Sequence, residues 1–105
     1  MKNVNQIEWQ DLIANDSNAV IINARTPREC AEGIIDKAIM IDFLDAPTFK
    51  SEIEKLDKSK NYYVYCRSGN RSGQACQFLE GFGINNTFNL NGGMLAWTGK
   101  TVIPA

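Results

Sequence analysis

A cysteine at the end of an apolar run is the residue in this sequence most suited to chemistry. The run at 62–65 stops at Cys66, and small, polar and cationic residues follow before a helical pattern begins. A thiol that precedes a helix N-terminus lies near free backbone N–H groups and the positive end of the helix dipole, and both lower its pKa. Arg67 and Arg71 add positive charge nearby. The sequence therefore indicates that Cys66 is a nucleophilic thiolate.

Three cysteines and the absence of histidine limit the chemistry that is open to Cys66. Without histidine the chain cannot form a Ser-His-Asp triad, a Cys-His pair or a histidine-ligated metal site. Cys30, Cys66 and Cys76 form no Cys-x-x-Cys pair and are odd in number, which favours reduced thiols over a disulfide framework. We expect Cys76 to fill a small apolar space in a helix, with a resolving role in redox chemistry as the alternative. No metal ion or organic cofactor is expected.

The overall composition is that of an ordinary globular protein. Hydrophobic residues make up 44% and charged residues 22% of the 105 residues, enough for one domain around a single core. The 11 basic and 12 acidic residues are spread along the chain without a basic tract, so we expect no nucleic-acid partner. We find neither an apolar stretch of membrane-spanning length nor a secretory signal, and therefore expect a cytoplasmic protein with no membrane partner.

Apolar runs alternate with amphipathic patterns along the chain, which predicts an α/β fold. A continuous apolar run, as at 19–22, is typical of a strand that is covered on both faces. We expect strands at 19–22, 38–41, 62–65 and 87–90, and helices at 7–14, 26–33, 47–56, 72–82 and 94–97. This order favours a small, mostly parallel central sheet flanked by helices on both faces, in one domain over residues 1–105. Ligands of such sheets bind beyond the carboxyl ends of the strands, which is where Cys66 falls.

Three segments resemble the single-domain rhodanese (thiosulfate sulfurtransferase) family, in the family's order and spacing. They are the loop Cys-Arg-Ser-Gly-Asn-Arg-Ser at 66–72, the early strand and Arg-x-Pro-x-Glu turn at 21–29, and the Gly-Gly-x-x-x-Trp segment within 90–97. The resemblance spans nearly the whole chain and implies a rhodanese-like fold. The chain departs from the family at Asn23, where the strand usually ends in Asp-x-Arg, and at Ile34, where the family has histidine. Without that carboxylate, Arg25 is expected to have a different partner.

Sulfur transfer fits the residues of the loop. The Cys66 thiolate attacks the outer sulfur of thiosulfate or a similar donor, a persulfide remains on the cysteine, and sulfite leaves without a general acid. A thiol, a protein or cyanide then accepts the outer sulfur. The rest of the loop is expected to bind the substrate through N–H groups, hydroxyls and guanidinium groups: Arg67, Ser68, Gly69, Asn70, Arg71 and Ser72.

Other functions share part of this pattern. A cysteine phosphatase places five residues between its cysteine and its arginine, whereas four separate Cys66 from Arg71. The smaller ring suits a single sulfur atom better than a phosphoryl group, so the loop length argues against a phosphatase. The alternative that stays open is a persulfide carrier loaded by a partner protein, or a non-catalytic rhodanese-like interaction module. High activity with thiosulfate would distinguish the enzyme from both.

Overall fold

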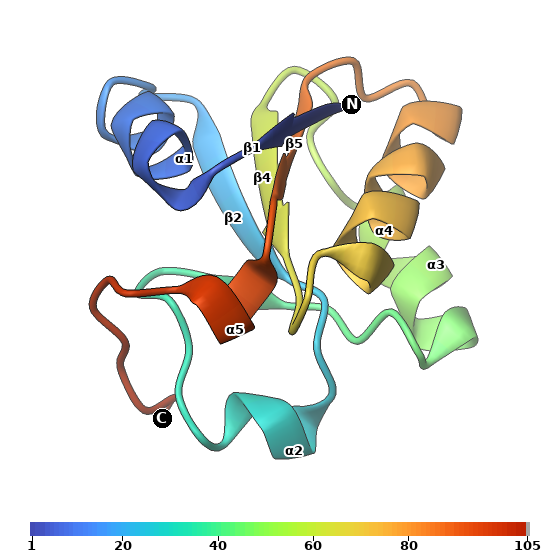
Figure 1. Cartoon of the computed structure of the whole chain (residues 1–105). Helices are drawn as coiled ribbons and strands as arrows, with labels where there is room; N and C mark the ends of the chain where they lie inside the picture. The colour runs from blue at the N-terminus through green and yellow to red at the C-terminus, as the bar shows by residue number, and fades with distance from the viewer. Residues whose placement is uncertain (105) are drawn as a thin grey trace.

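The computed structural model describes residues 1–104, which form a five-stranded sheet with helices on both faces (Figure 1). The strands are β1 (Lys2–Val4), β2 (Ala19–Asn23), β3 (Ile39–Met40), β4 (Asn61–Tyr65) and β5 (Thr87–Leu90). The helices are α1 (Gln6–Ala14), α2 (Pro27–Cys30), α3 (Ala46–Glu54), α4 (Asn70–Gly81) and α5 (Gly93–Ala96). The strand order is β1-β5-β4-β2-β3, and every neighbouring pair is parallel. The predicted α/β sheet is confirmed.

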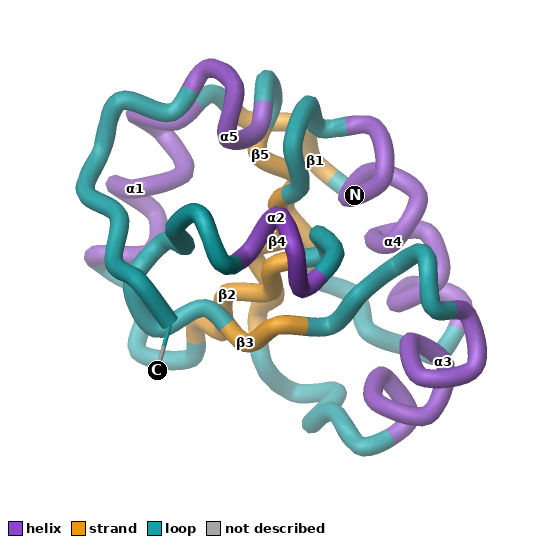
Figure 2. The backbone as a smooth tube through the Cα atoms, turned by 90° about the horizontal axis from the view of Figure 1, so that it is seen from below, coloured by secondary structure: helices purple, strands orange, loops and turns teal. Residues whose placement is uncertain are grey.

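The carboxyl ends of the strands all lie at one edge of the sheet, since the strands are parallel. Figures 1 and 2 show α2 and α5 beyond this edge, with α2 in front of the end of β4 in the view from below. Segments distant in the sequence therefore meet where β4 ends. No helix within residues 1–104 has the length and apolar character needed to cross a membrane.

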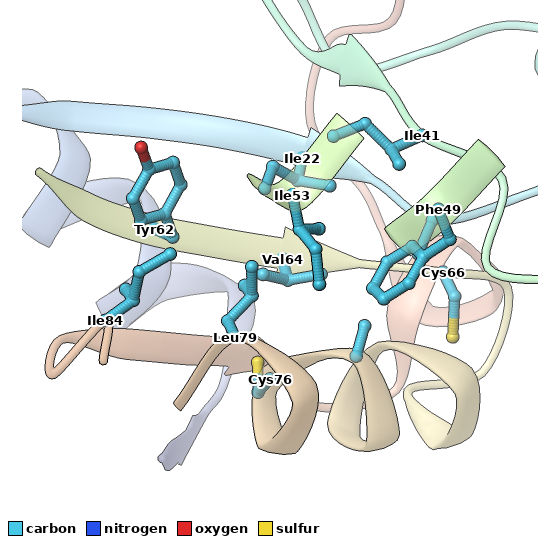
Figure 3. Close-up of a cluster of buried hydrophobic side chains, with 12 residues drawn as sticks. Ile22, Ile41, Phe49, Ile53, Tyr62, Val64, Cys66, Cys76, Leu79 and Ile84 are labelled. Atoms are coloured by element: carbon cyan, nitrogen blue, oxygen red, sulfur yellow. The ribbon is translucent and has the colours of Figure 1, made fainter. Parts of the chain in front are cut away.

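The central strand β4 shows why helices cover both faces of the sheet. Tyr62 and Val64 pack in the cluster formed with α3 and α4. Tyr63 and Tyr65 belong to the cluster on the opposite face, with α1 and α5. Successive side chains of a strand point to opposite faces, so the buried residues 62–65 of β4 need a cover on each side. Figure 3 shows the first cluster, which ends at Cys66 near the start of α4.

The edge strand β1 was not predicted from the sequence. It has three residues, Lys-Asn-Val, of which only the last is buried, so it lacks the apolar run that marks the other strands. The strand forms because it pairs with β5, with Asn3 opposite Asn89 and Val4 opposite Leu90. These partners lie 86 residues apart in the chain, beyond the reach of local sequence patterns.

Helix α4 begins at Asn70, two residues earlier than expected. Gly69 precedes the helix with φ of 101°, a left-handed conformation that glycine adopts without a steric penalty. The sequence placed residues 70 and 71 before the helix, whereas the structure places them in its first turn. The loop after β4 is therefore short, and the unpaired N–H groups of the helix start immediately after it.

Candidate active site

Cys66 directly follows the central strand β4, and its side chain is completely buried. Its Sγ accepts a hydrogen bond from the backbone N–H of Gly69 at 3.1 Å. The Oγ of Ser72, in the first turn of α4, lies 3.3 Å from the same sulfur. The left-handed Gly69 turns the loop back on itself, so the loop and the helix start surround the sulfur with hydrogen-bond donors.

These donors lower the pKa of the Cys66 thiol below its ordinary value of 9.0. Burial raises this pKa, but the hydroxyl of Ser72 and the backbone N–H groups of Ser72, Gly69 and Ser68 outweigh it by favouring the anion. The other two thiols differ. Burial raises the pKa of Cys30, and it raises the pKa of Cys76 to about 12. Of the three cysteines, Cys66 alone has surroundings that favour the thiolate.

The hydroxyl of Ser72 lies between two acceptors. Besides the sulfur, Oγ is within hydrogen-bond distance of Oδ1 of Asn89 in β5. The Nδ2 of Asn89 donates to the carbonyl of Gly69 at 3.0 Å and to Oδ1 of Asn3 in β1 at 2.8 Å. Asn89 thus touches both residues that donate to Cys66. Asn89 was not among the residues predicted for the site, although a polar residue within a predicted strand is the signal that could have identified it.

The two arginines of the loop have different surroundings. Arg71 donates from Nη1 and Nη2 to the two carboxylate oxygens of Glu29 in α2, both at 2.8 Å. The hydrogen bond from Arg71 is the largest cause that lowers the pKa of Glu29 to about 2. Arg67 is exposed and forms no ion pair with any of residues 1–104. Both arginines were expected to hold the substrate, but the guanidinium of Arg71 already has a carboxylate partner.

Glu29 is a residue whose role the sequence analysis missed. It is held by a capping box at the start of α2, in which Thr26 and Glu29 bond to each other's backbone N–H groups. The Arg-x-Pro-x-Glu turn marked this glutamate as part of a motif, but its partner lies 42 residues later. The pair joins the turn after β2 to the first turn of α4.

Helix α5 fixes the backbone of the cysteine loop. The N–H of Met94 donates to the carbonyl of Cys66 at 3.0 Å. The N–H of Leu95 donates to the carbonyl of Arg67, also at 3.0 Å. This close approach requires glycine at 93, since a Cβ there would lie 2.5 Å from the carbonyl oxygen of Cys66. The Gly-Gly segment that the sequence singled out thus packs directly on the loop.

At the first departure from the family pattern, Asn23 is the partner of Arg25. Its Oδ1 accepts hydrogen bonds from the backbone N–H of Arg25 at 2.9 Å and from Nε at 3.2 Å. Its Nδ2 lies 3.3 Å from Sγ of Cys30, and Arg25 also donates to the carbonyl of Gly33. The expected change of partner is therefore an amide oxygen and a carbonyl. At the second departure, Ile34 is a buried apolar residue.

A cleft of about 490 Å³ lies beside the loop. Its walls come from the segment around α2, from the cysteine loop, from α5 and from the segment that follows α5. The lining residues are Arg25, Glu29, Glu32, Gly33, Arg67, Met94, Leu95 and Thr101. The sequence-predicted residue Arg67 faces this space, whereas the buried Cys66 does not line it. This arrangement could hold an anionic molecule next to a thiolate.

Comparisons with known proteins identify relatives along nearly the whole chain. Residues 6–100 match the family profile described as Rhodanese-like domain. "Putative sulfurtransferase YtwF" of Bacillus subtilis is 38% identical over 101 residues, which cover 96% of this chain and 94% of that protein. A "Sulfurtransferase" of Allochromatium vinosum is 37% identical over 97 residues, which cover 90% of this chain and 88% of that protein.

Two further similarities concern a solved structure and a longer protein. The crystal structure of a rhodanese-like domain protein from Staphylococcus aureus matches with a TM-score of 0.84 at 27% identity, over 100% of both chains. A "tRNA uridine(34) hydroxylase" of Pelagibacter ubique is 32% identical over 88 residues. That match covers 84% of this chain but only 29% of the hydroxylase, so it relates this chain to a part of that protein.

Proposed function

The chain belongs to the rhodanese-like domain family, with sulfurtransferases among its relatives, and we propose that it transfers sulfur through a persulfide on Cys66. The donor is thiosulfate or a similar sulfane-sulfur compound, and the acceptor is a thiol or cyanide. One observation carries the proposal: the buried sulfur of Cys66, at the carboxyl end of β4, faces hydrogen-bond donors from Gly69 and Ser72 that favour its anion.

The loading step begins with the Cys66 thiolate. It attacks the outer sulfur of thiosulfate, a new S–S bond forms on Cys66, and the bond between the two thiosulfate sulfurs breaks. The electron pair of that bond leaves with sulfite, so no proton has to move and no histidine is needed. The persulfide is anionic at its outer sulfur, and the N–H groups of Ser68 and Gly69 and of the first turn of α4 are the proposed donors to it.

The loop residues take separate parts in this proposal. Arg67 is exposed and binds the sulfonate end of the donor by charge-assisted hydrogen bonds. Arg71 acts through its pair with Glu29, which holds the first turn of α4 in place. Ser72 donates to the sulfur of Cys66. Asn70, like Ser68 and Gly69, contributes its backbone N–H.

The complete burial of Cys66 favours a second candidate function, that of a persulfide carrier. A donor reaches the sulfur only when the loop moves, and the binding of a partner protein is one way to move it. A carrier would take up sulfur from a protein donor and not from thiosulfate alone. The hydroxylase activity named for the longer relative is not part of either proposal, since this chain matches 29% of that protein.

The formation of thiocyanate from thiosulfate and cyanide tests the proposed enzyme. We expect turnover by the wild type and none by Cys66→Ser, with unchanged circular dichroism and thermal unfolding. Cys30→Ser and Cys76→Ser are matched controls, because they change buried thiols whose pKa values are raised, and they should retain most of the activity. Full turnover by Cys66→Ser would refute the proposal. A wild type that takes up sulfur only from a protein donor would favour the carrier.

A further inference from the structure

Arg25 carries a buried positive charge that has only neutral partners. Its side chain is 6% exposed, and it donates to the amide oxygen of Asn23 and to the carbonyl of Gly33. Within residues 1–104, no carboxylate lies within ion-pair distance of it. A buried charge is unfavourable unless an opposite charge compensates it. Arg25 is therefore suited to bind an anion supplied by a ligand.

Arg25 is one of the residues that line the cleft beside the cysteine loop. Arg67, the residue after the proposed nucleophile, lines the same cleft. Two further lining residues, Met94 and Leu95, donate their backbone N–H groups to the carbonyls of Cys66 and Arg67. The cleft is thus continuous with the backbone that carries the reactive sulfur, and a molecule bound in it lies next to the loop.

The charges around the cleft favour an anion. Its lining contains the cations Arg25 and Arg67 and the anions Glu29 and Glu32. The charge of Glu29 is compensated by its bidentate pair with Arg71, which does not line the cleft. Glu32 and Arg67 are both exposed to solvent, where their opposite charges are screened. The buried charge of Arg25 is then the positive charge of the lining that remains uncompensated.

The size of the cleft indicates which reactant it holds. A volume of about 490 Å³ falls within the range of roughly 300–1,000 Å³ that is typical of sites for small organic ligands. Thiosulfate would fill only a small part of it. An organic thiol that carries a carboxylate would match both the volume and the charge.

We propose that this cleft binds the carboxylate of an anionic thiol, the sulfur acceptor, through Arg25 and Arg67. The inference rests on the proposed sulfurtransferase function and adds the chemical class of the acceptor. The bound acceptor thiol passes its proton to the anionic outer sulfur of the persulfide, Cys66–S–S⁻, and the resulting thiolate attacks that sulfur. The bond between that sulfur and Sγ breaks, its electron pair restores the Cys66 thiolate, and the outer sulfur leaves with its proton as the persulfide of the acceptor.

The substitution Asn23→Asp tests this proposal with little change in shape. The Oδ1 of Asn23 lies 3.2 Å from Nε of Arg25, so an aspartate would form an internal ion pair and neutralise the guanidinium. The Nδ2 of Asn23 lies 3.3 Å from Sγ of Cys30, and the S–H group could donate to the new carboxylate oxygen. The variant is therefore expected to fold, which thermal unfolding checks.

The measurement is the discharge of preloaded persulfide, followed by intact mass, with three thiols of similar size. They are 3-mercaptopropionate (anionic), 2-mercaptoethanol (neutral) and cysteamine (cationic). Comparing each thiol between wild type and Asn23→Asp cancels the intrinsic reactivity of the thiol. We expect the discharge rate with 3-mercaptopropionate to be about tenfold lower in Asn23→Asp, because one charge-assisted contact to the carboxylate is lost. The rates with the other two thiols should stay within about twofold or rise, because neither makes that contact.

Arg67→Gln is a second variant, which keeps the proposal testable if Asn23→Asp fails to fold. Arg67 is exposed, so its loss should leave the fold intact and cause the same selective slowing. An equal effect on all three thiols, or none, would overturn the anion site. A selective loss in thiosulfate loading without one in discharge would also overturn it, since the cleft would then serve the donor. A wild type that never loads would instead contradict the proposed function.

Discussion

The hydroxyl proton of Ser72 is one of the groups that lower the pKa of Cys66. Ser72 can donate this proton to the sulfur or to Oδ1 of Asn89, but not to both at once. A protonated thiol leaves the proton of Ser72 with Asn89. A thiolate attracts it, because hydrogen bonds to an ionised acceptor are stronger than those between neutral groups. Asn89, which lies in a strand next to β4, therefore accepts the proton of Ser72 only while Cys66 is a thiol.

Replacing Ser72 by alanine should raise the pKa of Cys66, because it removes one of the groups that lower it. The pH at which the rate of alkylation by iodoacetamide increases should therefore be higher in the variant than in the wild type. Near neutral pH we expect alkylation to be about tenfold slower, because the thiolate loses one hydrogen bond. Ser51→Ala on the exposed side of α3 is the control. An identical pH profile for Ser72→Ala and wild type would show that the hydroxyl does not donate to the thiolate.

At the scale of elements, helix α5 acts on the site through its backbone. Its first N–H groups hold the carbonyls of Cys66 and Arg67, as described above. Its other end is tied to α1, because Gln6 donates to the carbonyl of Ala96 and accepts from the N–H of Thr98 at 2.8 Å. The cysteine loop is thus anchored to a helix on the far side of the sheet from α4.

Gly93→Ala should separate α5 from the loop. The added Cβ would lie 2.5 Å from the carbonyl oxygen of Cys66 and 2.6 Å from the carbonyl carbon of Arg67. We expect a loss of about 2 kcal/mol in the free energy of unfolding, since backbone atoms cannot move aside as a flexible side chain would, and slower sulfur loading. Gly81→Ala in α4 is the matched control, because its added Cβ would meet nothing within 4 Å. Equal stability of the two variants would contradict this role of Gly93.

At the scale of the whole molecule, local patterns predicted the main architecture. β2, β3, β4 and β5 lie at the predicted strand positions. For the central strands β2 and β4 the signal is a continuous apolar run, because helices cover both of their faces. The same reasoning placed Cys66 at the carboxyl edge of the sheet. What the sequence did not reveal depends on distant partners: β1 forms only against β5, Glu29 meets Arg71, and Asn89 meets the loop.

The stability of the whole molecule in acid should depend on Glu29. Its pKa is about 2 in the folded protein, below the ordinary value of 4.5. The pair with Arg71 therefore stabilises the fold fully above pH 4.5, and this contribution is lost as the pH falls through 2. Glu29→Gln should lower the free energy of unfolding at neutral pH and reduce its decline in acid. Urea unfolding at a series of pH values gives the free energy of unfolding of each protein. The values for wild type and Glu29→Gln should become equal at low pH.

Glu32→Gln is the control for this prediction, because Glu32 is exposed and forms no ion pair within residues 1–104. The free energy of unfolding of Glu32→Gln should stay close to that of the wild type at every pH. If the curve of Glu29→Gln instead ran parallel to the wild type over the whole acid range, the ion pair would not contribute to folding.

The intact mass of the protein tests the persulfide on Cys66 most directly. The masses of reduced wild type and Cys66→Ser are measured by mass spectrometry before and after a brief exposure to thiosulfate, and again after cyanide is added. We expect the wild type to gain one sulfur atom and to lose it to cyanide, and the variant to gain none. A wild type without added sulfur, or a variant that gains sulfur equally, would contradict transfer from thiosulfate through Cys66.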